Sequence, residues 1–153
     1  MRRSTSELKK SRGFEGGKST AAYEFPVYSK LGRGGNYGSE ICPPVLADIS
    51  GTSDIEVAFK LAAWMERNKT TPPYAITLDK FTLFVTVESG AGTVEGTNEF
   101  TVTNPFVWDN CSVVIKDADA TTRIRIESKR PAGETTGWWR CCLDDLVIKY
   151  KQP

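Results

Sequence analysis

The sequence predicts an all-β fold, an antiparallel β-sandwich or jelly roll, for this chain of 153 residues. Three observations lead to that class. Apolar and polar residues alternate with a period of two in several separate runs, which is typical of strands with one buried face. Segments rich in glycine, proline and asparagine divide these runs. No run has the 3.6-residue periodicity of a helix, and the length suits a single domain with a substantial core.

The alternation is clearest in residues 54–64 (DIEVAFKLAAW) and 81–88 (FTLFVTVE). Shorter runs predict strands at 100–102, 111–116, 123–127 and, as a long final strand, 138–150. Proline interrupts two weaker candidates, 21–29 and 41–49, while the loops 67–73 and 89–98 are long enough to meet a ligand. Ten side chains of the predicted inner face are expected to be buried, namely Ile55, Val57, Phe59, Leu61, Leu83, Val85, Val113, Ile115, Ile124 and Ile126.

The net charge of +1 gives no reason to expect a nucleic-acid partner. The charge is uneven, because residues 1–20 carry +4 and the rest of the chain −3. Residues 1–12 lack apolar periodicity and are predicted to be a solvated basic tail or an expression remnant, with residues 13–153 forming one domain. A polyanion-binding arm is the weaker alternative. The two early arginines are not followed by an apolar run, so no signal peptide is visible.

Histidine is absent from the whole chain. Catalysis by Ser-His-Asp or Cys-His groups and imidazole-dependent metal sites are therefore excluded. An enzyme would need paired carboxylates, as in glycoside hydrolysis. Asp144 and Asp145 are adjacent and would diverge, and Glu127 and Glu134 have no recognisable setting, so a non-enzymatic role is expected. No apolar stretch approaches the roughly 20 residues of a membrane helix, so direct membrane insertion is not expected.

The four cysteines, Cys42, Cys111, Cys141 and Cys142, match no metal-binding spacing. Adjacent strand residues point to opposite faces, so Cys141 and Cys142 are expected to diverge. Free thiols are slightly favoured over one disulfide, and spacing alone does not choose a pairing.

Two carboxylates, Asp144 and Asp145, interrupt the apolar final strand. Strict alternation would place at least one of them beside core residues, where a carboxylate needs a cation or several donors. A bulge would turn one of them outward. Two interpretations stay open: a calcium ion, or carboxylates held by backbone amides or by Arg140, Lys30 or Arg125.

Glu15 lies in a glycine-rich segment, GFEGG, at residues 13–17. Glycines allow backbone carbonyls to turn inward, and calcium takes six to eight oxygen ligands. A glutamate in a first strand and an aspartate in a last strand could meet. Taken alone, this segment is more often a simple turn.

A sugar ring needs a flat aromatic face with polar groups around it. The candidates are Trp64, Tyr74, Trp108, Trp138 and Trp139, although core or rim packing is the commoner use of any single aromatic residue. Arg123, Arg125 and Glu127 form a polar stripe along one strand. That stripe is either a solvated sheet face or the floor of a sugar-binding concavity.

The order of these segments resembles a known family. GFE near the start, PPVLADISG and DIEVAFKLAAW in the middle, EFTVTN and VWDNCSVVIKDADATTRIRIES later, and LDDL at the end are similar to jelly-roll carbohydrate-binding modules with the galactose-binding-domain-like fold. Such modules occur in surface and secreted proteins of Bacteroidetes-type gut bacteria. The resemblance covers roughly residues 12–150. The final strand also resembles that of MAM-type adhesion domains.

The resemblance implies a non-catalytic module that binds a polysaccharide or glycan and forms part of a larger exported protein, extracellular, periplasmic or on the outer-membrane surface. It also implies a structural calcium at Glu15 and Asp144 or Asp145, with carbonyls from residues 32–38. The chain departs from the family by having Cys141–Cys142 in place of an aromatic pair and no acidic residue within 32–38. The alternative is a MAM-like, protein-binding adhesion module.

Overall fold

The computed structural model describes residues 3–4, 15–16, 23–24, 29–31, 40–67, 76–102, 104 and 107–151, with side chains described at 31, 40–65, 76–102, 104 and 107–151. Every regular element in these ranges is a strand, as the sequence predicts. The described part of the chain contains no helix of the length and hydrophobicity that a membrane span needs. The predicted basic tail, residues 1–12, includes the two-residue β1 and otherwise lies outside the described residues.

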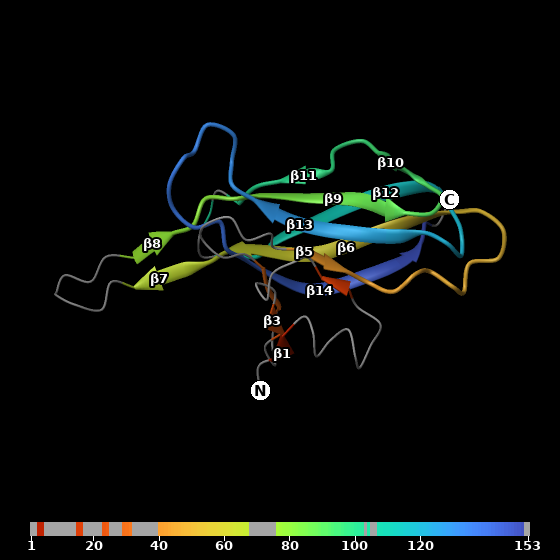
Figure 1. Cartoon of the computed structure of the whole chain (residues 1–153), viewed down its shortest axis with the longest axis horizontal. Coiled ribbons are helices and arrows are strands. Elements are labelled where there is room, and N and C mark those ends of the chain that lie inside the picture. The colour runs from red at the N-terminus through yellow and green to blue at the C-terminus, as the bar shows by residue number, and fades with distance from the viewer. Residues whose placement is uncertain are drawn as a thin grey trace.

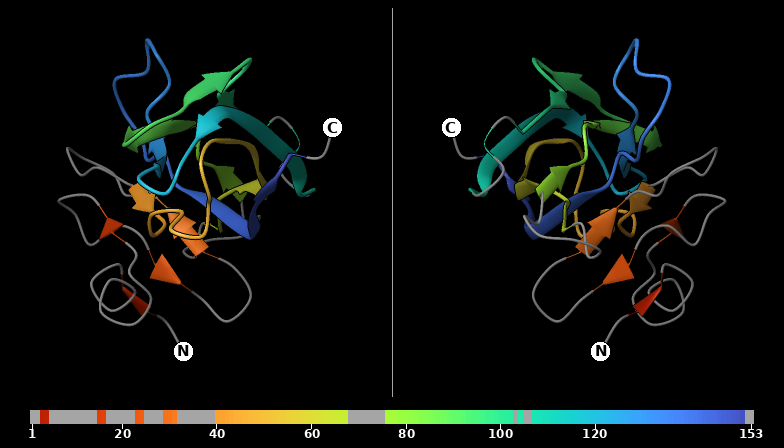
Figure 2. Two further views of the ribbon diagram at one scale, coloured as in Figure 1. Left: turned by 90° about the vertical axis from the view of Figure 1, so that its right-hand side faces the viewer. Right: turned by 90° about the vertical axis from the view of Figure 1, so that its left-hand side faces the viewer.

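Two antiparallel sheets face each other (Figures 1 and 2). The seven-stranded sheet runs in the order β1 (Arg3–Ser4), β3 (Tyr23–Glu24), β4 (Ser29–Leu31), β14 (Cys141–Tyr150), β6 (Ser53–Ala63), β12 (Asp109–Ala118) and β10 (Thr93–Glu95). The five-stranded sheet runs in the order β11 (Glu99–Phe100), β9 (Thr82–Ser89), β13 (Arg123–Lys129), β5 (Glu40–Cys42) and β2 (Glu15–Gly16). A separate hairpin joins β7 (Met65–Arg67) to β8 (Ile76–Leu78).

The core lies between the two sheets, and the alternating residues of each long strand fill it. All ten side chains expected to be buried are at most 3% exposed. Phe59 of the seven-stranded sheet meets Phe100 of the five-stranded sheet edge to face, with ring centroids 5.3 Å apart and an interplanar angle of 83°. Burial of each such apolar side chain stabilises the fold by roughly 1.5–3 kcal/mol. Because the period-two pattern places these side chains on one face of each strand, the apolar faces of the two sheets pack together.

The last strand contains the bulge that its two carboxylates suggested. The register of β14 against β6 shifts between Asp144 and Val147, and Asp145 has a positive φ of 50°. The shift leaves Asp144 half-buried and turns Asp145 out to solvent, where its carboxylate pairs with Lys60 at 2.7 Å. Neither carboxylate is therefore buried in the core.

Several predicted boundaries differ from the structure. Residues 43–49 form a loop after β5, because Pro43 and Pro44 cannot donate to a ladder. β14 begins at Cys141 and not at residue 138, since the backbone N–H of Arg140 donates to the carboxylate of Asp79 at 2.9 Å. The predicted loops 67–73 and 89–98 are bordered or interrupted by the short strands β7, β8 and β10.

Strand register brings all four tryptophans to one end of the sandwich, here called the tryptophan end. Asp109 pairs with Leu61, and Cys141 pairs with Ala63, so Trp64, Trp108 and residues 138–139 lie just beyond the ends of neighbouring strands. The hairpin β7–β8 projects from this end, away from the C-terminus (Figure 1). Arg123 lies at the opposite end of β13, across from Ser89.

Candidate functional site

A cleft of about 330 Å³ opens at the tryptophan end. Residues 77–80, which comprise the end of β8 and the start of its connection to β9, form one side, and parts of segment 130–140, which connects β13 to β14, form the other. Seven of its eleven lining residues are polar or charged, and its one aromatic lining residue is Trp138. Two segments distant in the sequence therefore build this cleft.

Trp138 and Trp139 diverge, as expected for adjacent residues. Trp138 is 50% exposed at the cleft, whereas Trp139 is 7% exposed and belongs to the core. The buried hydroxyl of Ser128 donates to the Trp139 carbonyl at 2.7 Å, and the Arg130 guanidinium lies 4.5 Å from the Trp139 ring centroid. The anchored Trp139 thus fixes the backbone from which Trp138 reaches solvent.

A buried ion pair between Asp79 and Arg140 forms the floor of the cleft. Asp79 Oδ2 accepts from Arg140 Nε at 2.5 Å and Asp79 Oδ1 from Arg140 Nη2 at 3.0 Å. The two side chains are only 8% and 7% exposed. The same guanidinium lies 4.5 Å from the Trp138 ring centroid and 5.7 Å from that of Trp64, within cation–π range of both.

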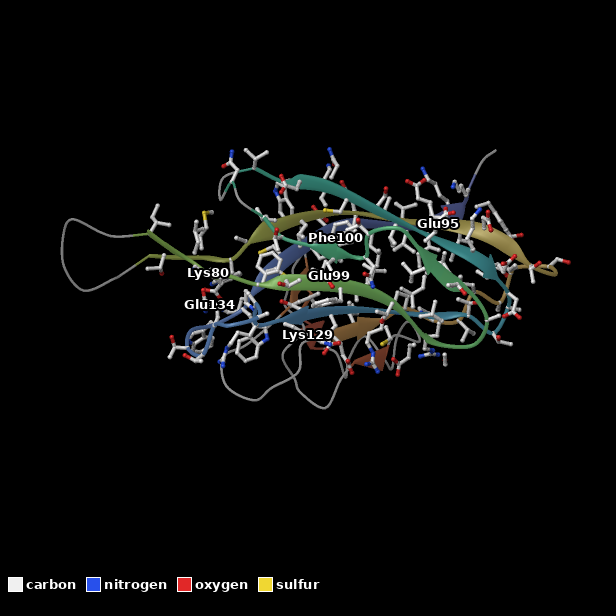
Figure 3. The ribbon with its side chains drawn as sticks, turned by 90° about the horizontal axis from the view of Figure 1, so that it is seen from above. Lys80, Glu95, Glu99, Phe100, Lys129 and Glu134 are labelled. Atoms are coloured by element: carbon white, nitrogen blue, oxygen red, sulfur yellow. The ribbon has the colours of Figure 1, made fainter. Side chains whose placement is uncertain are left out.

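The rim of the cleft carries a second, exposed ion pair between Lys80 and Glu134, 2.8 Å apart (Figure 3). The hydrogen bond to Glu134 raises the pKa of the Lys80 ammonium. Behind the rim, the backbone N–H of Glu134 donates to the Pro131 carbonyl at 3.2 Å, and Arg130 Nη1 donates to the Thr135 carbonyl at 3.0 Å. These bonds hold segment 131–137 in a defined shape.

The other predicted aromatic residues are placed as follows. Trp64 is half-buried at the base of the β7–β8 hairpin, where its carbonyl accepts from the backbone N–H of Asp79 at 3.1 Å. Trp108 is 39% exposed just before β12 and does not line the cleft. Tyr74 lies outside the described residues.

The predicted arginine stripe lies on the outer face of the five-stranded sheet and not in the cleft. Arg125 forms ion pairs with Glu88 and, at 3.4 Å, with Glu40. Burial alone would lower the pKa of the Arg125 guanidinium, but the hydrogen bond to Glu88 and the charges of both glutamates raise it overall. The stripe and the tryptophan end are therefore two separate surfaces, and neither Arg123 nor Arg125 lines the cleft of the tryptophan end.

The residues predicted to hold calcium are divided between the sheets. Glu15 lies in β2, which pairs with β5, whereas Asp144 and Asp145 lie in β14. Asp144 Oδ1 accepts from the backbone N–H of Asp145 at 2.9 Å, and the Asp145 carboxylate forms an ion pair with Lys60. The described residues contain no group of three or more histidine, cysteine or acidic side chains that could hold a metal ion. Because the Glu15 side chain is not described, the calcium site stays a prediction.

All four cysteines are free, which agrees with the favoured expectation. Burial and nearby carboxylates raise the pKa of Cys42 and of Cys111 to about 11, and burial raises the pKa of Cys141 further still. A thiol is nucleophilic as its thiolate, so these groups are poorly suited to covalent catalysis near neutral pH.

Five charged residues of the cleft were not predicted as site residues: Asp79, Lys80, Arg130, Glu134 and Arg140. Arg140 was considered only as a partner for Asp144 and Asp145, but its carboxylate partner is Asp79, 61 residues away in the sequence. Such a pairing leaves no local signal. A weak hint is available, since Arg140 interrupts an apolar run and Asp79 lies two residues before the predicted strand 81–88.

No protein-family model matches the chain, and no curated protein matches it. Among solved structures, a chain described as "CBM4 structure and function" is similar over 92% of both chains, with 15% sequence identity and a TM-score of 0.45. No residue role is carried over from that structure. The β-sandwich is established by the strand pairing itself.

Proposed function

We propose that this chain is a non-catalytic carbohydrate-binding domain that holds a glycan against Trp138 in the cleft of the tryptophan end. The observation that carries the proposal is the half-exposed Trp138 ring beside a polar cleft of about 330 Å³. A pyranose ring has apolar C–H faces and polar edges. It therefore suits an indole surrounded by hydrogen-bonding groups.

The polar groups of the cleft support binding over catalysis. The Asp79 carboxylate is buried against Arg140, and the Glu134 carboxylate is paired with Lys80. Glycoside hydrolysis needs two carboxyl groups that flank one bond, with one of them able to deliver a proton. Here each of the two carboxylates is already paired with a cation, and the chain has no histidine that could deliver the proton instead.

A protein partner is the second candidate, and the β7–β8 hairpin favours it. Met65, Ile76 and Leu78 are exposed on this hairpin, and exposed apolar clusters commonly mark protein-binding surfaces. An adhesion role would depend on these three residues and not on Trp138. Met65 and Ile76 do not line the cleft, so replacing these two residues by threonine separates the two functions.

The test is affinity electrophoresis and calorimetry with a panel of soluble polysaccharides. The unaltered chain is expected to bind at least one of them with a Kd on the order of micromolar to millimolar, since sugar stacking is shallow and wet. Trp138→Ala should abolish binding with little change in Tm, because an exposed ring contributes little to the core. Trp138→Phe should retain part of the affinity.

Trp108→Ala is the matched control, because Trp108 is also an exposed tryptophan at this end but lies outside the cleft. It should bind as the unaltered chain does. If Trp138→Ala binds normally, the cleft is not the glycan site.

The resemblance of the sequence further supports three proposals: an exported location, membership of a larger protein, and a structural calcium ion.

A further inference from the structure

We infer that Asp79 is a positioning residue for glycan binding, which acts through Arg140 to hold the ring of Trp138 ready for the sugar. The inference rests on the proposed function and adds to it a residue that does not itself need to touch the ligand. In this role Asp79 fixes the orientation of the Trp138 ring, on which the sugar stacks.

Three hydrogen bonds connect Asp79 to Arg140, and the Arg140 guanidinium contacts the Trp138 ring. The carboxylate accepts from Arg140 Nε, from Arg140 Nη2 and from the Arg140 backbone N–H, at 2.5, 3.0 and 2.9 Å. This fork fixes both the plane of the guanidinium and the backbone two residues after Trp138. The guanidinium then lies 4.5 Å from the Trp138 ring centroid.

The position of Asp79 is itself determined from two sides. Its backbone N–H donates to the Trp64 carbonyl at 3.1 Å, which closes the base of the β7–β8 hairpin. The backbone N–H of Trp64 in turn donates to the Arg140 carbonyl at 3.2 Å. Trp64, Asp79 and Arg140 therefore form a closed ring of hydrogen bonds beneath the cleft.

Burial explains why this pair acts as a support and not as a ligand contact. Both charged side chains are less than a tenth exposed, so Asp79 can neither swing out to a sugar nor lose Arg140 without leaving a buried charge unpaired. The exposed half of Trp138 lies at the end of this rigid chain of contacts. A ring held in advance loses less conformational entropy when a ligand stacks on it.

The experiment compares Asp79→Asn and Arg140→Lys with the unaltered chain on the best polysaccharide of the panel. Arg140→Lys keeps a positive charge for Asp79 but removes the planar group beside Trp138. We expect both variants to raise the Kd about tenfold. That is the scale of one lost cation–π contact together with the lost ordering of the Trp138 ring. In NMR spectra, the indole N–H signal of Trp138 should shift and broaden, whereas that of buried Trp139 should not.

Val57→Ala is the control for lost stability, because Val57 is fully buried in β6 and distant from the cleft. It should lower the Tm and leave both the Kd and the Trp138 signal unchanged. The inference is overturned if Asp79→Asn and Arg140→Lys bind normally, or if Val57→Ala weakens binding as much as they do for the same loss of Tm. If the unaltered chain binds no polysaccharide, the proposed function fails first, and that result is distinct from the other two.

Discussion

Neighbouring residues in this chain often have opposite environments, and the two tryptophans at 138 and 139 show what decides between them. Trp139 is enclosed by the core and by the Arg130 guanidinium, whereas Trp138 faces the cleft beside Arg140. The sequence predicts that one of the two rings is buried and the other exposed, because adjacent side chains diverge. Which ring is exposed depends on Ser128 and Asp79, whose contacts cross the fold and have no local signature.

Cysteine reactivity gives a prediction at the same scale. Cys111 is half-buried, and its pKa is raised to about 11 by burial and by the charge of Asp109. Below that pH only a small fraction is thiolate, so alkylation by iodoacetamide should be slow at pH 7.5. The rate should rise about tenfold for each pH unit up to about pH 10. Mass spectrometry of digested, timed samples measures this rate for each cysteine.

The fully buried Cys141 serves as the internal control and should be alkylated only after unfolding in guanidinium. Rapid alkylation of Cys111 at pH 7.5, with no further rise at higher pH, would contradict the raised pKa.

At the scale of single elements, period-two alternation predicts strands well where a strand is long and has one buried face. β6, β9 and β13 meet that condition. The same rule cannot find β7, β8 or β10, because each has three residues and most of their described side chains are exposed. Their pairing comes from neighbouring strands and not from a buried face, so the sequence carries little trace of it.

The turns on either side of β10 yield a prediction about two glycines, Gly90 before the strand and Gly96 after it. Gly90 and Gly96 both have positive φ, 84° and 76°. A Cβ on Gly90 would collide with the backbone carbonyl of Thr121, whereas a Cβ on Gly96 would meet nothing within 4 Å. Gly96→Ala should therefore cost only the backbone penalty, about 1–2 kcal/mol. Gly90→Ala should cost about 1–3 kcal/mol more, because the clash is with main chain.

Urea unfolding followed by tryptophan fluorescence gives both free energies of unfolding. Equal losses of unfolding free energy in the two variants would mean that Gly90 does not lie against the backbone carbonyl of Thr121.

At the scale of the whole molecule, the all-β sandwich and the ten core residues could be predicted from sequence, because burial against a facing sheet dictates the pattern along each strand. The candidate site could be predicted only in part. Trp138 is one of five aromatic candidates that the sequence offers, without a signal that separates it from Trp139. The cleft beside it could not be predicted, since it joins residues 77–80 to segment 130–140 only after both sheets have assembled.

The calcium proposal also belongs to this scale, because its ligands would join strands of different sheets. If calcium is bound by Glu15 with Asp144 or Asp145, excess chelator should lower the Tm, since a ligand that binds only the folded state stabilises it. Added calcium should restore the Tm, and the double variant Asp144→Asn, Asp145→Asn should abolish the response. Asp119→Asn is the control, because the Asp119 carboxylate bonds only within its own turn, to Thr121. A melting curve that is the same with and without chelator would rule the site out.

The base of the β7–β8 hairpin has an engineering consequence. The chain leaves the sandwich at Trp64 and returns at Asp79, and one hydrogen bond of 3.1 Å joins the two points. Segment 65–78 is therefore attached to the sandwich at a single junction, which this hydrogen bond closes. Because the entropy of closing a loop grows only slowly with its length, segment 65–78 can be exchanged for shorter or longer inserts at little thermodynamic cost. The junction lies beside the cleft, so the segment is a natural place to graft libraries that would give one scaffold many ligand preferences.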